Sequence, residues 1–551
     1  MIQRAWMKTS SRTRQRKVST AAPPAGEKEL LSPLTVYLAA IALAVGVFAI
    51  YSPSLNFPFI LDDHRFVGDP RVQSPGHVWE YFTNYVWAQY KGGPMSFYRP
   101  FFVLWMRLSF VLSEMSAWGW HLFSIVKHVL VAVLLGLLVW KLLRDRVAAL
   151  IAATLFALHP AQTESVAWVT VPDPLMAAAV LGTLLLYLKY TDRISADGQS
   201  HWLIASAAVG LAAMMAKETA VVLPVVLFAM ALVVPSGKSG WKDRLVSAFR
   251  QTLPFLVATA VYLLLRLNAL GGQVSSLTQH LSWSTVLLSW PATLWFYMKV
   301  LLWPVRLRAF ADPTLAETFS VRGVLLPGLG VCCAAAALAL ACVWGWRKAR
   351  HEANVQRALL LGLLLLMLPI LLTLNLNSLN PGDFLHGRYT YLSLTGLMLL
   401  LATGWHLVKK GQTVLLAAVG LLAIAFGVLT MQQESAWKDD LSVFTIAHQN
   451  APHNEFVAKN LVNAHVQIAL QGLDQGGRCE DALPIFEQAT QQYPQEWFAW
   501  AGLGECFVKL NDLPRAEQSL RRASELSHEP RVTEVWREVQ SRMGLISAPV
   551  Q

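Results

Sequence analysis

Long runs of apolar residues limit what this chain of 551 residues can fold into. A hydrocarbon core about 30 Å thick requires roughly 20 apolar residues in one helix. Eleven runs approach this length, near 34–52, 119–143, 147–168, 172–190, 202–216, 218–235, 249–267, 323–346, 358–376, 386–406 and 412–431. Only 14% of the residues are charged, compared with about 25% in soluble proteins. We therefore expect an all-α, polytopic membrane protein with about eleven spans.

A twelfth run, 283–305, is interrupted by Pro291, and the basic residues indicate whether it crosses. Cytoplasmic loops carry an excess of Lys and Arg, and the N-terminal tail (1–33) is strongly basic. If 283–305 does not cross, the basic clusters near 347–357 and 409–410 fall on the same side as the tail. We therefore predict eleven crossings and a cytoplasmic tail. This topology also explains the net charge of +11 without a nucleic-acid partner.

The predicted topology divides the chain into a basic tail (1–33), a transmembrane domain (34–431) and a soluble C-terminal domain (432–551). A long outer loop, 53–118, follows the first span, and loops of this length are usually functional. Its second half, 98–113, is apolar but too short to span. We expect that segment to form a helix in the outer interface.

The C-terminal domain carries a helical repeat. The segment 497–530 is 34 residues long, which is the tetratricopeptide period. Its bulky, small and aromatic positions are Trp500, Leu503, Gly504, Phe507, Ala516, Leu520, Ala523 and Pro530. An ordinary helical bundle would explain the apolar spacing but not this order, which recurs one unit upstream. We predict a tetratricopeptide-repeat α-solenoid that binds proteins or peptides.

Ionisable residues within or beside membrane spans are costly and are therefore candidates for function. They form three groups at the predicted outer ends of spans: Asp62 and Asp63; His159, Glu164, Asp173, Lys217 and Glu218; and Arg388, followed by Tyr389. Each group has an ordinary interpretation: a loop start or helix cap for the aspartates, local pairing for Lys217, and a headgroup anchor for Arg388. Their placement on one face nevertheless favours a polar pocket at the lipid boundary. Acids and cations there suit a reaction with an anionic, lipid-linked donor, because a base can deprotonate an acceptor while cations stabilise a departing phosphate.

Compartment and metal content are less constrained by the sequence. No Asn-x-Ser/Thr sequon occurs at any Asn, which favours a bacterial inner membrane with periplasmic repeats over an endoplasmic reticulum membrane with lumenal repeats. The five cysteines show no metal-ligand spacing. We therefore predict no zinc site, and dependence on a divalent metal stays open.

The joint order of several short motifs resembles the transmembrane and tetratricopeptide-repeat glycosyltransferases, GT-C-type enzymes related to protein O-mannosyltransferases. The motifs are Asp62-Asp63, the run Gly68–Gln73, Tyr98-Arg99-Pro100, Leu158-His159-Pro160, Thr163–Ala167, Asp173, Ala216–Ala220 and Gly387–Leu392. The resemblance covers about 34–545. His386-Gly387 before Arg388, and Ser393 after it, depart from the family pattern.

This resemblance implies a GT-C fold and a glycosyltransferase that moves mannose or a similar hexose, with inversion, from a polyprenyl-phosphate donor to Ser or Thr hydroxyls of a protein. It implies that Asp62 or Asp63 is the base, that Arg388 holds the donor phosphate, and that Lys217 and Arg99 assist. The remaining pocket residues would be Tyr98, His159, Glu164, Asp173, Glu218 and Tyr389. The implied partners are the lipid-linked donor and a protein acceptor that the repeats recruit. The alternatives are a non-catalytic scaffold that displays the repeats, and a GT-C transferase that acts on glycans or lipids.

Overall fold

The protein is an assembly of helices. The computed structural model describes residues 32–89, 97–192, 200–233, 240–272, 281–305, 310–311, 315–379, 385–408, 410–527 and 530–545. These residues contain no β-strand beyond an isolated bridge between Ala311 and Leu385, which confirms the predicted all-α class. The predicted cytoplasmic tail lies almost entirely outside the described residues.

Eight helices of the described residues are long and apolar enough, by length and composition, to cross a membrane. They are α1 (Pro33–Tyr51), α6 (Ala117–Leu143), α9 (Asp173–Asp192), α12 (Trp241–Ala269), α13 (Trp283–Leu302), α14 (Leu326–Lys348), α15 (Ala353–Leu372) and α17 (Gln412–Glu434). Shorter helices pack with them: α5 (Pro100–Ser113), α7 (Arg146–Ala157), α10 (Ser200–Ala216), α11 (Leu223–Val233) and α16 (Tyr391–Leu407). A polytopic helical membrane domain is therefore confirmed, whereas the count of eleven spans stays a prediction.

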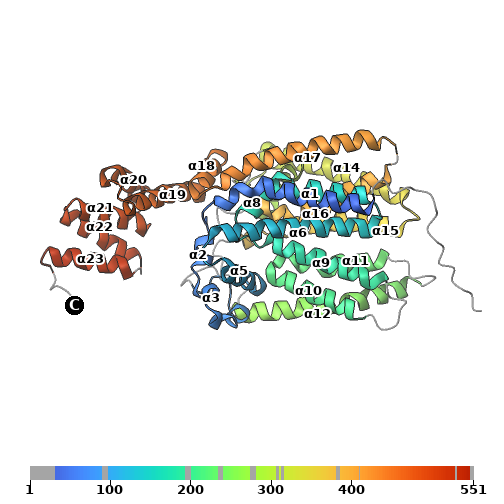
Figure 1. The fold of residues 1–551 in the computed structure, drawn as a ribbon, viewed down its shortest axis with the longest axis horizontal. Coiled ribbons are helices and arrows are strands. Elements are labelled where there is room, and N and C mark those ends of the chain that lie inside the picture. Colours follow the sequence, from blue (N-terminus) through green and yellow to red (C-terminus); the bar gives the residue numbers. More distant parts are fainter. Residues whose placement is uncertain are drawn as a thin grey trace, which may run out of the picture.

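The long helices run roughly parallel to one another, and the short helices α2 (Asp63–Val67), α3 (Pro70–Gln73), α5 and α8 (Thr163–Ala167) gather at one end of the bundle (Figure 1). The C-terminal helices extend beyond this same end (Figure 1). We call it the repeat end. The outer loop, the segment after α7 and the start of the C-terminal region, which are distant in sequence, therefore meet in one place.

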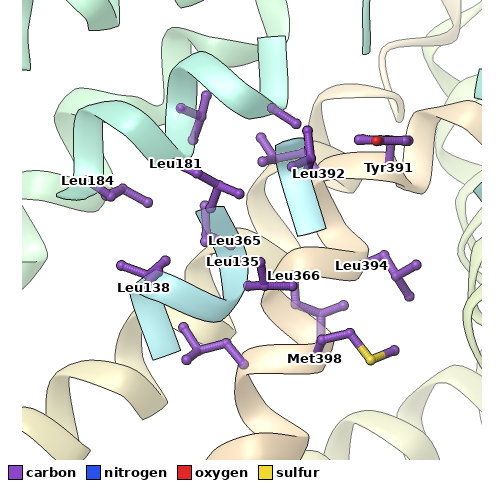
Figure 2. Packing of buried hydrophobic residues seen from close by; sticks show 14 of the residues in the cluster. Leu135, Leu138, Leu181, Leu184, Leu365, Leu366, Tyr391, Leu392, Leu394 and Met398 are labelled. Atoms are coloured by element: carbon purple, nitrogen blue, oxygen red, sulfur yellow. The ribbon is translucent and has the colours of Figure 1, made fainter. Parts of the chain in front are cut away.

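Four helices form the centre of the bundle. Figure 2 shows their buried side chains in contact, with labelled residues Leu135 and Leu138 from α6, Leu181 and Leu184 from α9, Leu365 and Leu366 from α15, and Tyr391, Leu392, Leu394 and Met398 from α16. Two glycines let α15 and α16 approach at backbone distance, because a Cβ on Gly396 would lie 2.6 Å from the carbonyl oxygen of Gly362. Small residues at such crossings stabilise helix pairs in a membrane through close packing. The hydrophobic effect does not drive this association, because lipid tails are as apolar as the side chains.

The predicted span 147–168 is wrong in its second half. Helix α7 ends at Ala157, and a short helical turn (Pro160–Gln162) and α8 follow it. The reason is Pro160, which disfavours helical backbone at the residue before it; His159 is accordingly extended, with ψ at 124°. The chain from 158 to 172 therefore forms short turns at the repeat end instead of completing a span.

The expected interruption at Pro291 is also wrong, because α13 continues through this residue. Hydrogen bonds join both ends of α13 to chain segments at the repeat end. The backbone nitrogen of Leu281 donates to Asn377 Oδ1 at 2.8 Å, and His159 Nε2 lies 3.1 Å from the carbonyl oxygen of Leu301. Because α13 is long and apolar enough to cross a membrane, the non-crossing position of 283–305 stays a prediction.

The C-terminal region consists of paired antiparallel helices. They are α18 (Asp440–Asn450), α19 (Glu455–Asp474), α20 (Cys479–Gln492), α21 (Trp497–Lys509), α22 (Leu513–Leu526) and α23 (Pro530–Arg542). The predicted small positions are the points of closest packing: a Cβ on Gly504 would lie 2.6 Å from Leu520 Cγ. The predicted unit 497–530 is thus one helix pair, α21 with α22, and α23 covers its end.

Candidate functional site

A cavity of about 460 Å³ lies at the repeat end and collects most of the predicted residues. Its lining comes from the outer loop, the 168–173 segment, the 217–219 turn, the end of α15 and the start of the 388–389 turn. Seven predicted residues line it: Asp62, Arg99, Asp173, Lys217, Glu218, Arg388 and Tyr389. Four others, Asp63, Tyr98, His159 and Glu164, are not part of the lining.

The two adjacent aspartates have different environments. Asp62 is half-buried, lines the cavity and makes no side-chain capping hydrogen bond to α2. Asp63 is fully buried, and it accepts hydrogen bonds from Thr170 Oγ1 at 2.7 Å, from the Thr170 backbone nitrogen at 3.2 Å and from the Ile60 backbone nitrogen at 3.1 Å. Asp63 thus joins the outer loop to the 168–173 segment, while Asp62 faces the cavity.

Burial raises the pKa of Asp63 to about 7; the bonds from Thr170 and Ile60 oppose this shift, and the Asp62 charge adds to it. An aspartate has a pKa of about 3.9 when unfolded. The folded protein therefore retains a proton that the unfolded chain releases between about pH 4 and 7, so the stability contribution of Asp63 falls as the pH rises through this range and is constant above it.

We expect Asp63→Asn to remove this pH dependence. Each unit of pKa corresponds to about 1.4 kcal/mol, so the melting temperature of the variant minus that of the wild type should rise between pH 5 and 8. Thermal unfolding in detergent at several pH values measures this difference. A constant difference across the range would contradict the assignment.

Arg388 is held by a buried carboxylate and an aromatic face. Its guanidinium lies 4.4 Å from the ring centre of Trp168, and its Nη1 donates to Glu164 Oε1 at 3.2 Å. The same Glu164 accepts the backbone N–H of Arg388 at 3.0 Å and contacts His386 Nδ1 at 2.7 Å. Glu164 therefore positions Arg388 from behind the cavity wall.

Two further cations of the cavity are each paired with an acid. Lys217 Nζ lies 2.7 Å from both carboxylate oxygens of Asp173, and both side chains are buried. Arg99 makes a bidentate pair with Glu218, with Nε to Oε2 at 2.9 Å and Nη2 to Oε1 at 2.6 Å. The predicted local pairing of Lys217 is thus with Asp173, which is 44 residues distant in sequence, rather than with its neighbour Glu218.

The buried Lys217–Asp173 pair gives a stability prediction. Asp173→Ala should destabilise the protein by about 3–5 kcal/mol, because it leaves a buried ammonium without its partner. The double variant Lys217→Met with Asp173→Leu should unfold close to the wild-type temperature, since apolar residues of similar volume can replace a buried ion pair. Thermal unfolding of the three proteins measures this, and a double variant as unstable as the single one would refute the account.

His159 and Tyr98 have structural roles in this arrangement. The ring of His159 is fully buried: its Nδ1 accepts the Ala161 backbone N–H at 3.2 Å, its Nε2 contacts the carbonyl oxygen of Leu301, and it packs on Phe426 at 4.6 Å. Tyr98 is also buried and donates its hydroxyl to the carbonyl oxygen of Phe82 at 3.0 Å. Neither side chain is part of the cavity lining.

The cavity also has lining residues that were not predicted, among them Arg266, Trp168, Thr170 and Asn377. Arg266 lies in the last turn of α12, at the predicted outer end of the 249–267 span. The criterion that selected the other charged residues would therefore have selected Arg266 too. Trp168, Thr170 and Asn377 carry no comparable sequence signal. The described residues contain no group of three or more His, Cys, Asp or Glu that could hold a metal ion.

Comparisons with known proteins match both parts of the chain. A family model described as Dolichyl-phosphate-mannose-protein mannosyltransferase matches residues 98–265, and one described as Tetratricopeptide repeat matches residues 475–535. The second match confirms the repeat prediction for that segment. The first contains Arg99, Asp173 and Lys217, but neither Asp62 nor Arg388.

Curated relatives carry the name protein O-mannosyl-transferase. TMTC3 of Homo sapiens is 26% identical over 542 residues, which cover 89% of this chain and 55% of the relative. Tmtc1 of Drosophila melanogaster is 33% identical over 181 residues, which cover 32% of this chain and 20% of the relative. The chain thus spans about half the length of the first of these relatives.

Among solved structures, the apo form of the Archaeoglobus fulgidus oligosaccharyltransferase matches with a TM-score of 0.40 and 13% identity, covering 79% of this chain and 60% of that one. The chain is therefore similar to dolichyl-phosphate-mannose-protein mannosyltransferases over residues 98–265 and to tetratricopeptide repeats over residues 475–535, and relatives named protein O-mannosyl-transferase match most of its length.

Proposed function

We propose that this chain is a membrane glycosyltransferase that moves mannose or a similar hexose from a polyprenyl-phosphate donor to Ser or Thr hydroxyls of a protein. The observation that carries the proposal is the cavity at the repeat end, where Asp62 shares a wall with Arg388, Lys217 and Arg99. A carboxylate and several cations in one cavity supply both a proton acceptor and partners for a phosphate.

In this mechanism Asp62 accepts the proton of the acceptor hydroxyl as the oxygen attacks the anomeric carbon of the sugar. The bond between that carbon and the phosphate oxygen breaks, and the polyprenyl phosphate leaves with the electron pair. A single displacement of this kind inverts the anomeric configuration. Asp62 is the better candidate of the two aspartates because Asp63 is fully buried and engaged with Thr170 and Ile60.

The leaving phosphate needs positive charge, and Arg388 is the cation best suited to supply it. A guanidinium presents several donors in a planar fork that matches phosphate oxygens, and the contacts with Trp168 and Glu164 fix its plane. Lys217 and Arg99 are also paired with carboxylates, at 2.7 and 2.6 Å, which is closer than the 3.2 Å between Arg388 and Glu164. Their pairs orient the cavity wall and add donors, while Arg388 binds the departing group.

The repeats extend from the end of the bundle at which α2, α5 and α8 gather (Figure 1), and residues of the outer loop and of the 168–173 segment at this end line the cavity. An acceptor protein bound by the repeats is therefore close to the donor. We propose that this end faces away from the cytoplasm, in a bacterial inner membrane with periplasmic repeats; the alternative is an endoplasmic reticulum membrane with lumenal repeats. The scaffold alternative gives no role to the charged cavity. A transferase acting on glycans or lipids differs only in the acceptor.

The test uses purified full-length protein in vesicles that contain a polyprenyl-phosphate hexose. We expect radiolabelled sugar to appear on a Ser/Thr-containing protein acceptor and not on one in which these residues are Ala. If the label appears only on added glycan or lipid, the acceptor is a glycan or lipid and not a protein. No transfer with any of several hexose donors, with or without divalent metal, would overturn the enzymatic proposal.

A further inference from the structure

The first α-helix after the last span, α18, packs against the outer loop and the 168–173 segment, both of which contribute residues to the cavity lining. The carboxylate of Asp440, in the first turn of α18, accepts the backbone N–H of Leu61 at 2.8 Å, across 379 residues of sequence. The side chains around this contact share one buried cluster, to which the outer loop gives Ile60, the 168–173 segment gives Trp168 and Val171, and α18 gives Val443 and Phe444. Leu61 immediately precedes the proposed base, Asp62.

Leu61 has an unfavourable backbone conformation. Its φ is +53°, which lies in a left-handed region that is strained for residues other than glycine. The turn closes with a hydrogen bond from the Asp63 backbone nitrogen to the carbonyl oxygen of Ile60 at 2.9 Å. A strained conformation of this kind persists only when the surroundings hold it.

This strained turn determines the directions of the two aspartates. It places Asp62 in the cavity lining and Asp63 against Thr170. Asp63 holds one side of the turn through the Ile60 N–H, and Asp440 holds the other through the Leu61 N–H. Without the second bond, the turn keeps the Asp63 bond and the packing of the Leu61 side chain against the buried cluster, but loses the hydrogen bond to the Leu61 backbone itself.

A second path of contacts runs from the same helices to Arg388. Trp437, just before α18, stacks on Trp168 at 6.3 Å with an angle of 22° between the rings, and Trp168 carries the Arg388 guanidinium. The ring centre of Phe444, on α18, lies 5.4 Å from that of Phe310. The ring centre of Phe310 in turn lies 4.9 Å from that of His386, which contacts Glu164. Both the proposed base and the proposed phosphate-binding group therefore rest on the start of the C-terminal region.

We propose that Asp440 is a positioning residue that holds the left-handed turn at Leu61 and thereby directs Asp62 into the cavity. This inference rests on the proposed function for the role of Asp62. It makes α18 a working part of the active site, so the C-terminal region does more than recruit an acceptor. Displacement of α18 would release the turn and lower the rate of the chemical step.

The chain offers a matched control beside Asp440. Asp439 caps α18, with its Oδ1 accepting the Ser442 backbone N–H at 2.7 Å. Asp439→Ala removes that cap and destabilises α18 without removing a contact to Leu61. Asp440→Asn keeps an oxygen acceptor for the Leu61 N–H, whereas Asp440→Ala removes it. Leu61→Gly removes the backbone strain itself, because glycine adopts positive φ without cost.

Transfer by the full-length variants gives the first readout. We expect Asp440→Ala to lower kcat by about 10-fold to 100-fold with little change in the KM of the donor. Asp440→Asn and Asp439→Ala should stay within about threefold of the wild type, and Leu61→Gly should restore most of the activity of Asp440→Ala. Wild-type activity in Asp440→Ala, or an Asp440→Asn variant as impaired as Asp440→Ala, would overturn the proposal.

Thermal unfolding gives a second readout that does not depend on catalysis. The effect of Leu61→Gly on the melting temperature should differ between the wild-type and Asp440→Ala backgrounds, because the strain is present only while Asp440 holds the turn. It should be the same in the wild-type and Asp439→Ala backgrounds. Equal effects of Leu61→Gly in the wild-type and Asp440→Ala backgrounds would refute the proposal that Asp440 holds the turn. Unequal effects in a protein that transfers no sugar would refute only the enzymatic role.

Discussion

Replacement of Asp62 by Asn is expected to lower kcat for sugar transfer by about 10²-fold to 10⁴-fold, the usual contribution of a general base. The amide keeps the size of the side chain but cannot accept the hydroxyl proton. Because the substitution keeps the size of the side chain, the melting temperature should change little. Transfer from a polyprenyl-phosphate hexose, measured together with thermal unfolding, checks both expectations.

Glu80→Gln is the matched control for this prediction. Glu80 is a partly exposed acid of the same outer loop that pairs with His77 rather than lining the cavity, so its neutralisation should leave kcat unchanged. Full activity in Asp62→Asn, combined with a large loss in Asp63→Asn at unchanged stability, would transfer the role of base to Asp63. Full activity in both variants and in the double variant would exclude either aspartate as the base.

Arg388→Lys is expected to lower kcat/KM by about 10²-fold to 10³-fold, although it keeps the positive charge. The lysine ammonium is a point charge that cannot reproduce the planar fork, and the loss of one preorganised donor to a developing anion typically has an effect of this size. The variant should still fold, because an ammonium can remain beside the buried Glu164 carboxylate. Initial rates at varied donor concentration measure the effect.

Arg107→Lys provides the comparison for this substitution. Arg107 lies on α5 at the same end of the protein, where its Nη1 donates to the carbonyl oxygens of Val72 and Gln73 outside the cavity. We expect less than a threefold change in kcat/KM. Equal activity of Arg388→Lys and the wild type at all donor concentrations would remove Arg388 from the phosphate-binding role.

The sequence predicted the two-part organisation well, because both signals are local. Twenty apolar residues in succession require a lipid-facing or buried helix wherever they lie, and the 34-residue repeat fixes helix pairs through neighbours such as Gly504 and Leu520. The charged residues were also identifiable, because ionisable groups are rare in this chain. Seven of those predicted line one cavity.

The sequence did not predict which charges pair or which way they face. Lys217 pairs with Asp173 and not with the adjacent Glu218, and Arg99 pairs with Glu218 at a separation of 119 residues. Pairing depends on how helix ends meet in space, and short-range spacing carries no information about that. The orientation of α13 relative to the membrane is likewise not predictable from its apolar length alone.

What the sequence by itself determined is the all-helical, membrane-spanning character of the chain, the repeat period and the charged residues that an apolar chain retains. Only the tertiary structure distinguished Asp62 from Asp63, because adjacent residues of the same type differ solely in what surrounds them. That difference arises at Leu61, where a strained turn is held by Asp440 from the far end of the chain. Local residue preferences disfavour a positive φ at leucine, so the sequence around Leu61 does not predict this turn. The turn depends on a hydrogen bond to a residue 379 positions away, which only the tertiary structure shows.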